Sequence, residues 1–190
     1  IDLFEAEYNQ VERQFMDPTS DLYQFDAQYV VVFQFFHKWN EHYSLLSAQE
    51  QLSLADNRLD FVREVCASTQ AKVLYFNYPE IEDTVFVSYA NKIESSFTYQ
   101  VRKMNFELMR LSQEYQNLFI CDIAGLQNKL GRDVMFDPMV YTTTEMILSL
   151  DAVPYVASRV LDVICAIQGK FKKCIILDLD NTLWGGVVGD

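Results

Sequence analysis

The chain has 190 residues, with 15 basic and 27 acidic side chains and a net charge of −12. This balance disfavours a nucleic-acid interface and an anionic membrane surface, because both attract clustered Lys and Arg. No apolar run reaches the roughly 18 residues that a membrane helix needs. Half of the residues are hydrophobic, so we expect one packed domain and the start of another.

Five short apolar segments are predicted to form strands. They cover residues 2–8, 29–35, 72–77, 118–123 and 174–179. The second, YVVVFQF, is continuously apolar, which is typical of a strand covered by helices on both faces. Pro79 follows the third, at a point where a strand can leave a sheet.

Three longer amphipathic segments are predicted to form helices. In residues 48–68, one stripe contains Leu52, Ala55, Leu59, Val62 and Cys66. In residues 97–115, steps of three and four residues align Phe97, Val101, Met104, Leu108, Leu111 and Tyr115, which favours a helix packed on a sheet over a coiled-coil surface. The third segment, residues 151–168, has Pro154 in its first turn and is followed by Gly169, a suitable residue to end it.

The alternation of strands and helices predicts an α/β fold with a doubly wound, mainly parallel sheet flanked by helices. Such sheets bind ligands beyond the carboxyl ends of their strands. The basic sequence GKFKK at residues 169–173 predicts a domain boundary there or a little earlier. We therefore expect an α/β domain over residues 1–169 and the start of a second domain over residues 170–190.

The cysteines give an expectation about the redox environment. Cys66, Cys121, Cys165 and Cys174 lie among apolar residues and form no CxxC pair. With two histidines in the chain, a Cys/His zinc site is disfavoured. We expect buried, reduced thiols, as in a cytoplasmic protein. The sequence shows no signal peptide. Because the chain opens with Ile1 rather than Met, we expect its natural start to lie upstream.

Asp178 and Asp180 are the residues of this sequence best suited to catalysis. Both follow the apolar CIIL, and residues two apart on a strand point to the same side. Two adjacent carboxylates need a cation, and their hard oxygens suit Mg²⁺. One carboxylate can attack phosphorus and the other can protonate the leaving oxygen. Thr182 can bond to the turn or to phosphoryl oxygens.

Two other interpretations of this pair are a solvated turn and a calcium loop. A lone DxD is often a solvated turn. An EF-hand loop needs a further oxygen ligand followed by Gly, whereas Thr182 and Leu183 follow here. An apolar strand leading into D-x-D-x-T-L favours the catalytic interpretation.

ILDLDNTL resembles the first motif of the haloacid dehalogenase (HAD) superfamily of phosphotransferases. WGGVVGD, which follows it, resembles the FkbH-like branch, as do residues 7–25 and 121–141. The resemblance implies an SGNH-hydrolase-like, flavodoxin-like domain whose first strand lies outside this sequence. It also implies that the first strand of a HAD Rossmann-like domain follows.

The resemblance implies specific roles for the aspartates. Asp178 is the expected nucleophile and Asp180 the expected general acid, with Mg²⁺ bound by the Asp178 carboxylate and the Asp180 carbonyl. The expected reaction takes a phosphorylated three-carbon acid, removes phosphate and loads a glyceryl group onto an acyl carrier protein. The later HAD motifs lie beyond Asp190, so residues 1–190 alone are expected to be inactive.

The alternatives concern the pathway and the first domain. The parent protein could be a generic HAD phosphatase in polysaccharide biosynthesis rather than an enzyme of secondary metabolism. The first domain could be a non-catalytic recognition module for a carrier or partner protein. An SGNH triad is disfavoured, because Asn40, His37, His42 and Asp137 do not complete the pattern and Val140 stands where Asp-x-x-His needs His.

Aromatic residues after the third strand have two interpretations, of which packing beneath a loop is favoured over a partner surface. Tyr78, Phe86 and Tyr89 follow its carboxyl end, where they either pack beneath a loop or dock a carrier protein and its pantetheine arm. Carrier proteins are usually acidic, so docking needs a basic patch. The candidates for that patch are Arg102, Lys103 and Arg110.

Overall fold

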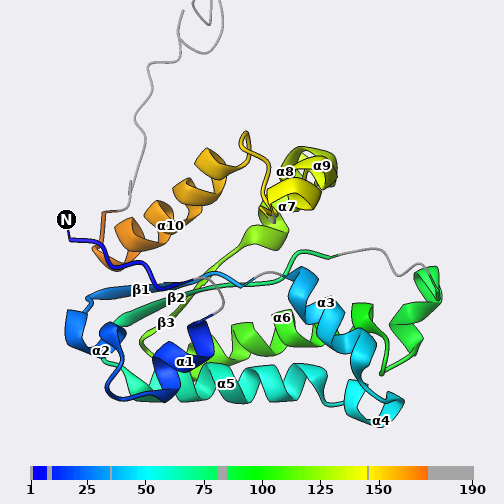
Figure 1. The fold of residues 1–190 in the computed structure, drawn as a ribbon, viewed down its shortest axis with the longest axis horizontal. Coiled ribbons are helices and arrows are strands. Elements are labelled where there is room, and N and C mark those ends of the chain that lie inside the picture. Colours follow the sequence, from blue (N-terminus) through cyan, green and yellow to red (C-terminus); the bar gives the residue numbers. More distant parts are fainter. Residues whose placement is uncertain (1, 8–9, 35, 81–84, 145, 171–190) are drawn as a thin grey trace, which may run out of the picture.

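The computed structural model describes residues 2–7, 10–34, 36–80, 85–144 and 146–170. Three parallel strands, β1 (Tyr29–Val32), β2 (Lys72–Phe76) and β3 (Leu118–Cys121), form a sheet in the order β1-β2-β3. Helices lie on both faces of this sheet (Figure 1). The predicted α/β class with a parallel sheet flanked by helices is therefore confirmed.

The helices that connect the strands share one face of the sheet. α5 (Leu54–Ser68) leads into β2 and α6 (Phe97–Glu114) leads into β3, and both lie below the sheet in Figure 1. Right-handed crossovers that advance in one direction across a sheet place their helices on the same side. The opposite face carries α10 (Val153–Ile167), which packs near β3.

Shorter helices surround this frame. α1 (Val11–Met16) and α2 (Asp21–Phe25) lie on the side of α5 (Figure 1). α3 (Phe36–Leu45) follows β1, and the 3₁₀ helix η1 (Val87–Lys92) precedes α6. Between β3 and α10 the chain forms α7 (Ile123–Leu130), α8 (Arg132–Met135) and α9 (Pro138–Thr144).

The apolar stripe of α6 fills the core as its spacing predicted. Phe97, Val101, Met104, Leu108 and Leu111 are all buried, and Tyr115 packs against them half-buried at the C-cap. The helix predicted over residues 151–168 forms as α10 (Val153–Ile167), with Pro154 in its first turn and Gly169, at φ +70°, after its end. Glycine adopts this left-handed conformation without strain.

The predicted single helix over residues 48–68 is wrong. The chain forms α4 (Ala48–Gln51), breaks, and restarts at Leu54 as α5. Ser47 and Glu50 make a reciprocal capping box that starts α4, and such caps favour a helix start locally. The break leaves Leu52 half-buried, outside the core stripe of α5.

The predicted first strand is also wrong over the residues that the structure describes, because residues 2–7 form no strand. The other strands are one to three residues shorter than predicted. The predicted strand at residues 174–179 lies outside the described residues. Within the described part of the chain, every helix is too short or too polar to cross a membrane.

Candidate functional site

Polar side chains follow each strand at the carboxyl edge of the sheet. Gln34 comes two residues after β1, Asn77 directly follows β2, and Asp122 directly follows β3. Parallel sheets of this kind bind ligands outside this edge. It is therefore the candidate site within the described part of the chain.

Asn77 and Asp122 join β2 to the start of α7. The Asn77 amide donates to Asp122 Oδ1 at 2.8 Å, and Asn77 Oδ1 accepts from the backbone N–H groups of Ile123 and Ala124 at 2.8 and 3.1 Å. Asp122 Oδ1 also accepts from Gly125 N at 2.8 Å. These bonds satisfy the free N–H groups of the first helical turn. The pair therefore acts as a structural brace, meaning that its hydrogen bonds fix the first turn of α7 to the end of β2.

Gly125 allows this brace to form. A Cβ atom at this position would lie 2.3 Å from Asp122 Oδ2. Any larger residue would therefore displace the carboxylate that caps α7. The sequence CDIAG contains both Asp122 and Gly125, but their close approach is visible only in the folded helix.

A second polar network lies between α5, α1 and β2. Arg58 Nε donates to the hydroxyls of Tyr75 and Tyr78 at 2.9 and 3.1 Å, and its Nη1 donates to Glu12 Oε1 at 3.0 Å. The two hydroxyls are 3.0 Å apart. Gln34 Nε2 also donates to Glu12 Oε1, at 2.9 Å. Through Gln34 and Glu12, this network connects the carboxyl edge of the sheet to Arg58 on the α5 face.

Burial controls the ionisation of this network. Burial alone would lower the pKa of the Arg58 guanidinium, but the tyrosines and Glu12 raise it overall. Burial opposes ionisation of Glu12, yet hydrogen bonds from Gln34 and Arg58 lower the net pKa of Glu12. The pKa of Tyr75 is raised, first by burial. At neutral pH the network therefore holds a cation at Arg58, a carboxylate at Glu12 and a neutral phenol at Tyr75.

Two buried polar atoms in this region have no hydrogen-bond partner: Gln34 Oε1 and Arg58 Nη2. An unsatisfied buried group costs about 1–3 kcal/mol. Gln34 also lines a cavity of about 10 Å³ together with Asn77 and Phe136, a volume close to that of one water. A polar ligand, a water or a further protein group can satisfy the Gln34 oxygen.

The residues considered for an SGNH triad do not form one. Asp137 Oδ1 accepts from the backbone N–H groups of Met139 and Val140, so it caps α9. His37 stacks on Tyr141 with ring centroids 4.7 Å apart, and its buried Nδ1 has no hydrogen-bond partner. Burial, together with Arg132, lowers the pKa of His37. His42 is exposed and Asn40 is half-buried on α3.

The aromatic residues after β2 separate into two groups. Tyr78 is 2% exposed and belongs to the Arg58 network, so the partner-surface interpretation is wrong for it. Phe86 and Tyr89 are 39% and 62% exposed. Only this second pair is available as an apolar contact surface.

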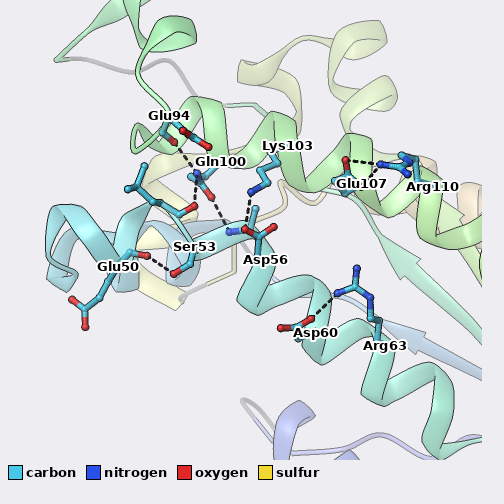
Figure 2. A network of polar contacts seen from close by, with 12 residues as sticks. Glu50, Ser53, Asp56, Asp60, Arg63, Glu94, Gln100, Lys103, Glu107 and Arg110 are labelled. Carbon is cyan, nitrogen blue, oxygen red and sulfur yellow. Dashed lines mark hydrogen bonds and ion pairs between the residues drawn. The ribbon is translucent and has the colours of Figure 1, made fainter.

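The predicted basic patch is neutralised by ion pairs. Lys103 Nζ lies 2.7 Å from Asp56, and Arg110 lies 3.2 Å from Glu107 (Figure 2). Arg102 pairs with Glu80 at 2.5 Å. Each cation thus has a carboxylate neighbour, and these three residues give no local excess of positive charge.

The predicted catalytic and metal residues Asp178, Asp180 and Thr182 lie outside the described residues. Within the described part, no group of three or more His, Cys, Asp or Glu side chains could hold a metal ion. Cys66 and Cys121 are buried and free, as predicted, whereas Cys165 is exposed, so its predicted burial is wrong. Cys165 lies on α10 away from the buried side that contains Val156.

Sequence reasoning missed Gln34, Arg58, Asn77 and Asp122 as members of one region. The available signal was a polar residue at the end of each apolar strand, in FQF, YFN and ICD. Arg58 gave no signal, because a lone Arg in an amphipathic helix is usually exposed.

Comparison with known proteins identifies the family of the chain. The model of the FkbH N-terminal domain matches residues 1–165. A solved structure, the N-terminal part of the protein BF1531 from Bacteroides fragilis, contains a phosphatase domain and is complexed with Mg. It is 61% identical, with a TM-score of 0.94, and the match covers 100% of this chain and 50% of that one. No protein of curated function matches.

The present chain therefore spans half the length of its solved relative. The family match covers the sheet, the carboxyl-edge residues and nearly all of α10. The chain belongs to the FkbH family, and residues 1–165 are its N-terminal domain.

Proposed function

We propose that the longer polypeptide is a Mg²⁺-dependent HAD phosphatase or phosphotransferase whose catalytic domain begins at residue 170. The observation that carries this proposal is the 61% identity, over the whole chain, to a protein described as containing a phosphatase domain complexed with Mg. The ILDLDNTL motif falls within that matched length.

The donor atoms of the motif fit a magnesium ion. Asp178 and Asp180 supply hard oxygen ligands, which Mg²⁺ prefers. When bound, Mg²⁺ neutralises negative charge at the phosphoryl group. Asp178 attacks phosphorus and holds the phosphoryl group as an aspartyl phosphate, while the bond from phosphorus to the leaving oxygen breaks and Asp180 gives that oxygen a proton. Thr182 hydrogen-bonds the turn or the phosphoryl oxygens.

We further propose that the substrate is a phosphorylated three-carbon acid whose carboxyl group is activated as an acyl phosphate. The thiol of an acyl carrier protein attacks the acyl carbon, phosphate leaves, and the glyceryl group is then held as a thioester. The support for this step is the resemblance of WGGVVGD to the FkbH-like branch. The ion pairs of Arg102, Lys103 and Arg110 argue against those residues as the docking patch. An acidic carrier therefore needs another contact surface.

The first domain is proposed as a recognition module. The observation that favours this role is the exposure of Phe86 and Tyr89 after β2, while Asp137 is occupied as a helix cap. Exposed aromatic side chains are enriched at protein interfaces. Binding of a carrier protein that is weakened by Tyr89→Ala, with the Mg²⁺-dependent phosphatase rate unchanged, would support this division of roles.

The decisive experiment uses the full-length protein and its Asp178→Asn variant. Each is incubated with Mg²⁺, a phosphorylated glycerate and a candidate carrier protein, and intact masses are recorded. A glyceryl mass gain that disappears in the variant is expected. Phosphate release that depends on Asp178, without a mass gain, would retain the phosphatase and reject carrier loading. Unchanged activity in the variant would reject both.

A further inference from the structure

A hollow lies at the amino edge of the sheet, opposite the candidate site. It has a volume of about 490 Å³ and is lined by residues at the starts of β1 and β2 and at the end of α10. Leu22, Tyr29, Val30 and Ile167 contribute apolar side chains that pack on the core but stay partly uncovered. Ligand pockets have volumes in this range. The hollow is therefore large enough to bury an aromatic side chain.

The rim of the hollow is polar. Asp26, Gln28 and Gln70 line it and are exposed. Lys72 also lines it, and its Nζ lies 6.0 Å from the ring centroid of Phe119. Asp26 supplies a carboxylate at this rim, which suits a basic segment of chain.

α10 delivers the chain to this hollow. Gln168 Nε2 donates to the Tyr29 hydroxyl at 3.3 Å, so the end of α10 is tied to the start of β1 (Figure 1). The N–H groups of Gly169 and Lys170 donate to carbonyls of the last turn of α10 at 3.0 and 2.8 Å. With Gly169 at φ +70°, these two bonds form a Schellman motif, which ends a helix with a defined backbone. The path of the chain is therefore fixed as far as Lys170.

The residue types that follow Lys170 match the hollow. Phe171 is a single large apolar side chain, and two further lysines come directly after it. Burial of a Phe side chain is favourable, whereas lysine heads stay in water. Phe171 follows Ile167 by four residues, a span of about 14 Å at most. The Phe171 ring is thus within reach of the hollow that Ile167 lines.

We propose that Phe171 inserts into this hollow and that the two lysines after it lie along the rim at Asp26. The joint between the two domains is then docked on the first domain rather than free. This inference takes from the proposed function that a second domain begins at residue 170. A docked joint holds that second domain at the amino edge of the sheet.

Docking at this edge leaves the candidate site uncovered by the joint. Gln34 and Asn77 follow the carboxyl ends of β1 and β2. β2 has five residues, which is a length of about 16 Å. The joint and the candidate site therefore lie at opposite ends of the sheet, and a ligand can reach the carboxyl edge while the joint stays docked.

The first test is trypsin digestion of the full-length protein, because trypsin cleaves after lysine and residues 170–173 contain three lysines. A docked joint is cleaved only when it opens. We expect Phe171→Ala to raise the rate of cleavage within the joint at least about tenfold, because the burial of the ring is lost. Phe106→Ala, which removes a ring that is 56% exposed on α6, is the matched control and should leave the rate unchanged.

A peptide of residues 165–180, with and without the substitution, gives the cleavage rate of a free joint and the preference of trypsin itself. Cleavage of the wild-type protein at the rate of this peptide would overturn the proposal. Equal rates in the wild type and Phe171→Ala, after this correction, would also overturn it. Wild-type cleavage that speeds up on dilution would assign the hollow to a second copy, against the proposal.

The second test fills the hollow from its rim. Gln70 is exposed and lines the hollow, so Gln70→Trp can occupy the space without a change in the core. We expect this variant to speed cleavage of the joint at least about tenfold, whereas Gln113→Trp on the exposed side of α6 should not. Faster cleavage in Phe171→Ala alone would place the Phe171 ring on another surface and overturn the proposal.

Phosphate release separates this inference from the proposed function, because digestion needs no turnover. Asp178→Asn is expected to lose phosphate release and to keep the slow cleavage of the joint. Slow cleavage of a wild-type protein that releases no phosphate with Mg²⁺ would reject the phosphatase and support the docked joint. Mg²⁺-dependent phosphate release from a protein whose joint is cleaved as fast as the peptide would support the phosphatase and reject the docked joint.

Discussion

Replacing Gln100 by Leu tests whether one buried amide holds the start of α5, α6 and the loop before α6 together. Gln100 on α6 is fully buried. Its Oε1 accepts from Ala55 N at 2.9 Å, and its Nε2 donates to the carbonyls of Leu52 and Glu94 at 3.2 and 2.7 Å (Figure 2). The amide thus satisfies the first turn of α5 and the loop before α6.

The expected magnitude follows from the three groups that lose a partner. A net hydrogen bond contributes about 0.5–1.5 kcal/mol, and a buried donor left unpaired costs about 1–3 kcal/mol. Ala55 is fully buried, while Glu94 is exposed and Leu52 half-buried, so water can reach the two carbonyls but not the Ala55 N–H. The Leu side chain recovers some apolar burial. We expect a net loss of about 2–3 kcal/mol.

The measurement is thermal unfolding of the full-length protein by calorimetry. A loss of about 2–3 kcal/mol corresponds to a Tm lower by roughly 4–12 °C in a domain of this size. Gln113→Leu, on the exposed side of α6, is the matched control and is expected to leave Tm unchanged. A Gln100→Leu transition within about 1 °C of the wild type would refute the reasoning.

Three further predictions concern individual groups. Asn77→Ala should lower the free energy of unfolding by about 1–2 kcal/mol in denaturant titrations, because the first turn of α7 loses its hydrogen bonds. Asn128→Ala, on the exposed side of α7, should leave it unchanged, and equal values for the two variants would contradict the brace. The lowered pKa of Glu12 stabilises the fold above the ordinary value of about 4.3, and this contribution is lost as pH falls through the folded pKa. The Tm difference between wild type and Glu12→Gln should therefore shrink towards pH 3, and a constant difference would rule this out. A thiol reagent at pH 8 should label the exposed Cys165 but not Cys66 or Cys121, because burial raises the pKa of Cys66 to about 11 and that of Cys121 to about 12. Peptide mapping that finds Cys66 labelled in the native protein would disprove this prediction.

Local sequence patterns predicted the central elements because those patterns depend on short-range geometry. The three- and four-residue steps of residues 97–115 produced α6, and the apolar runs at 29–35, 72–77 and 118–123 contain the three strands. The prediction missed the break at Leu52 because the apolar stripe continues through it, while Ser53, whose hydroxyl bonds to Glu50 O, stands between α4 and α5 as the N-cap residue of α5.

The candidate site was less predictable, because its members come from separate elements. Glu12, Gln34, Arg58 and Tyr78 are brought together only when α1, α5 and the ends of β1 and β2 pack. The basic residues of α6 illustrate the same limit. Their spacing suggested a patch, but Asp56 on α5 and Glu80 after β2 neutralise Lys103 and Arg102 across the fold.

The sequence alone determined the fold class, the core stripe of α6 and a motif whose residue types suit phosphoryl transfer. Each is a property of neighbours along the chain, where periodicity and side-chain chemistry act directly. Tertiary structure decided which polar groups pair, which cations are neutralised and which apolar surfaces stay open. Those outcomes depend on contacts between residues such as Gln100 and Ala55, which are 45 positions apart and meet only after the chain folds.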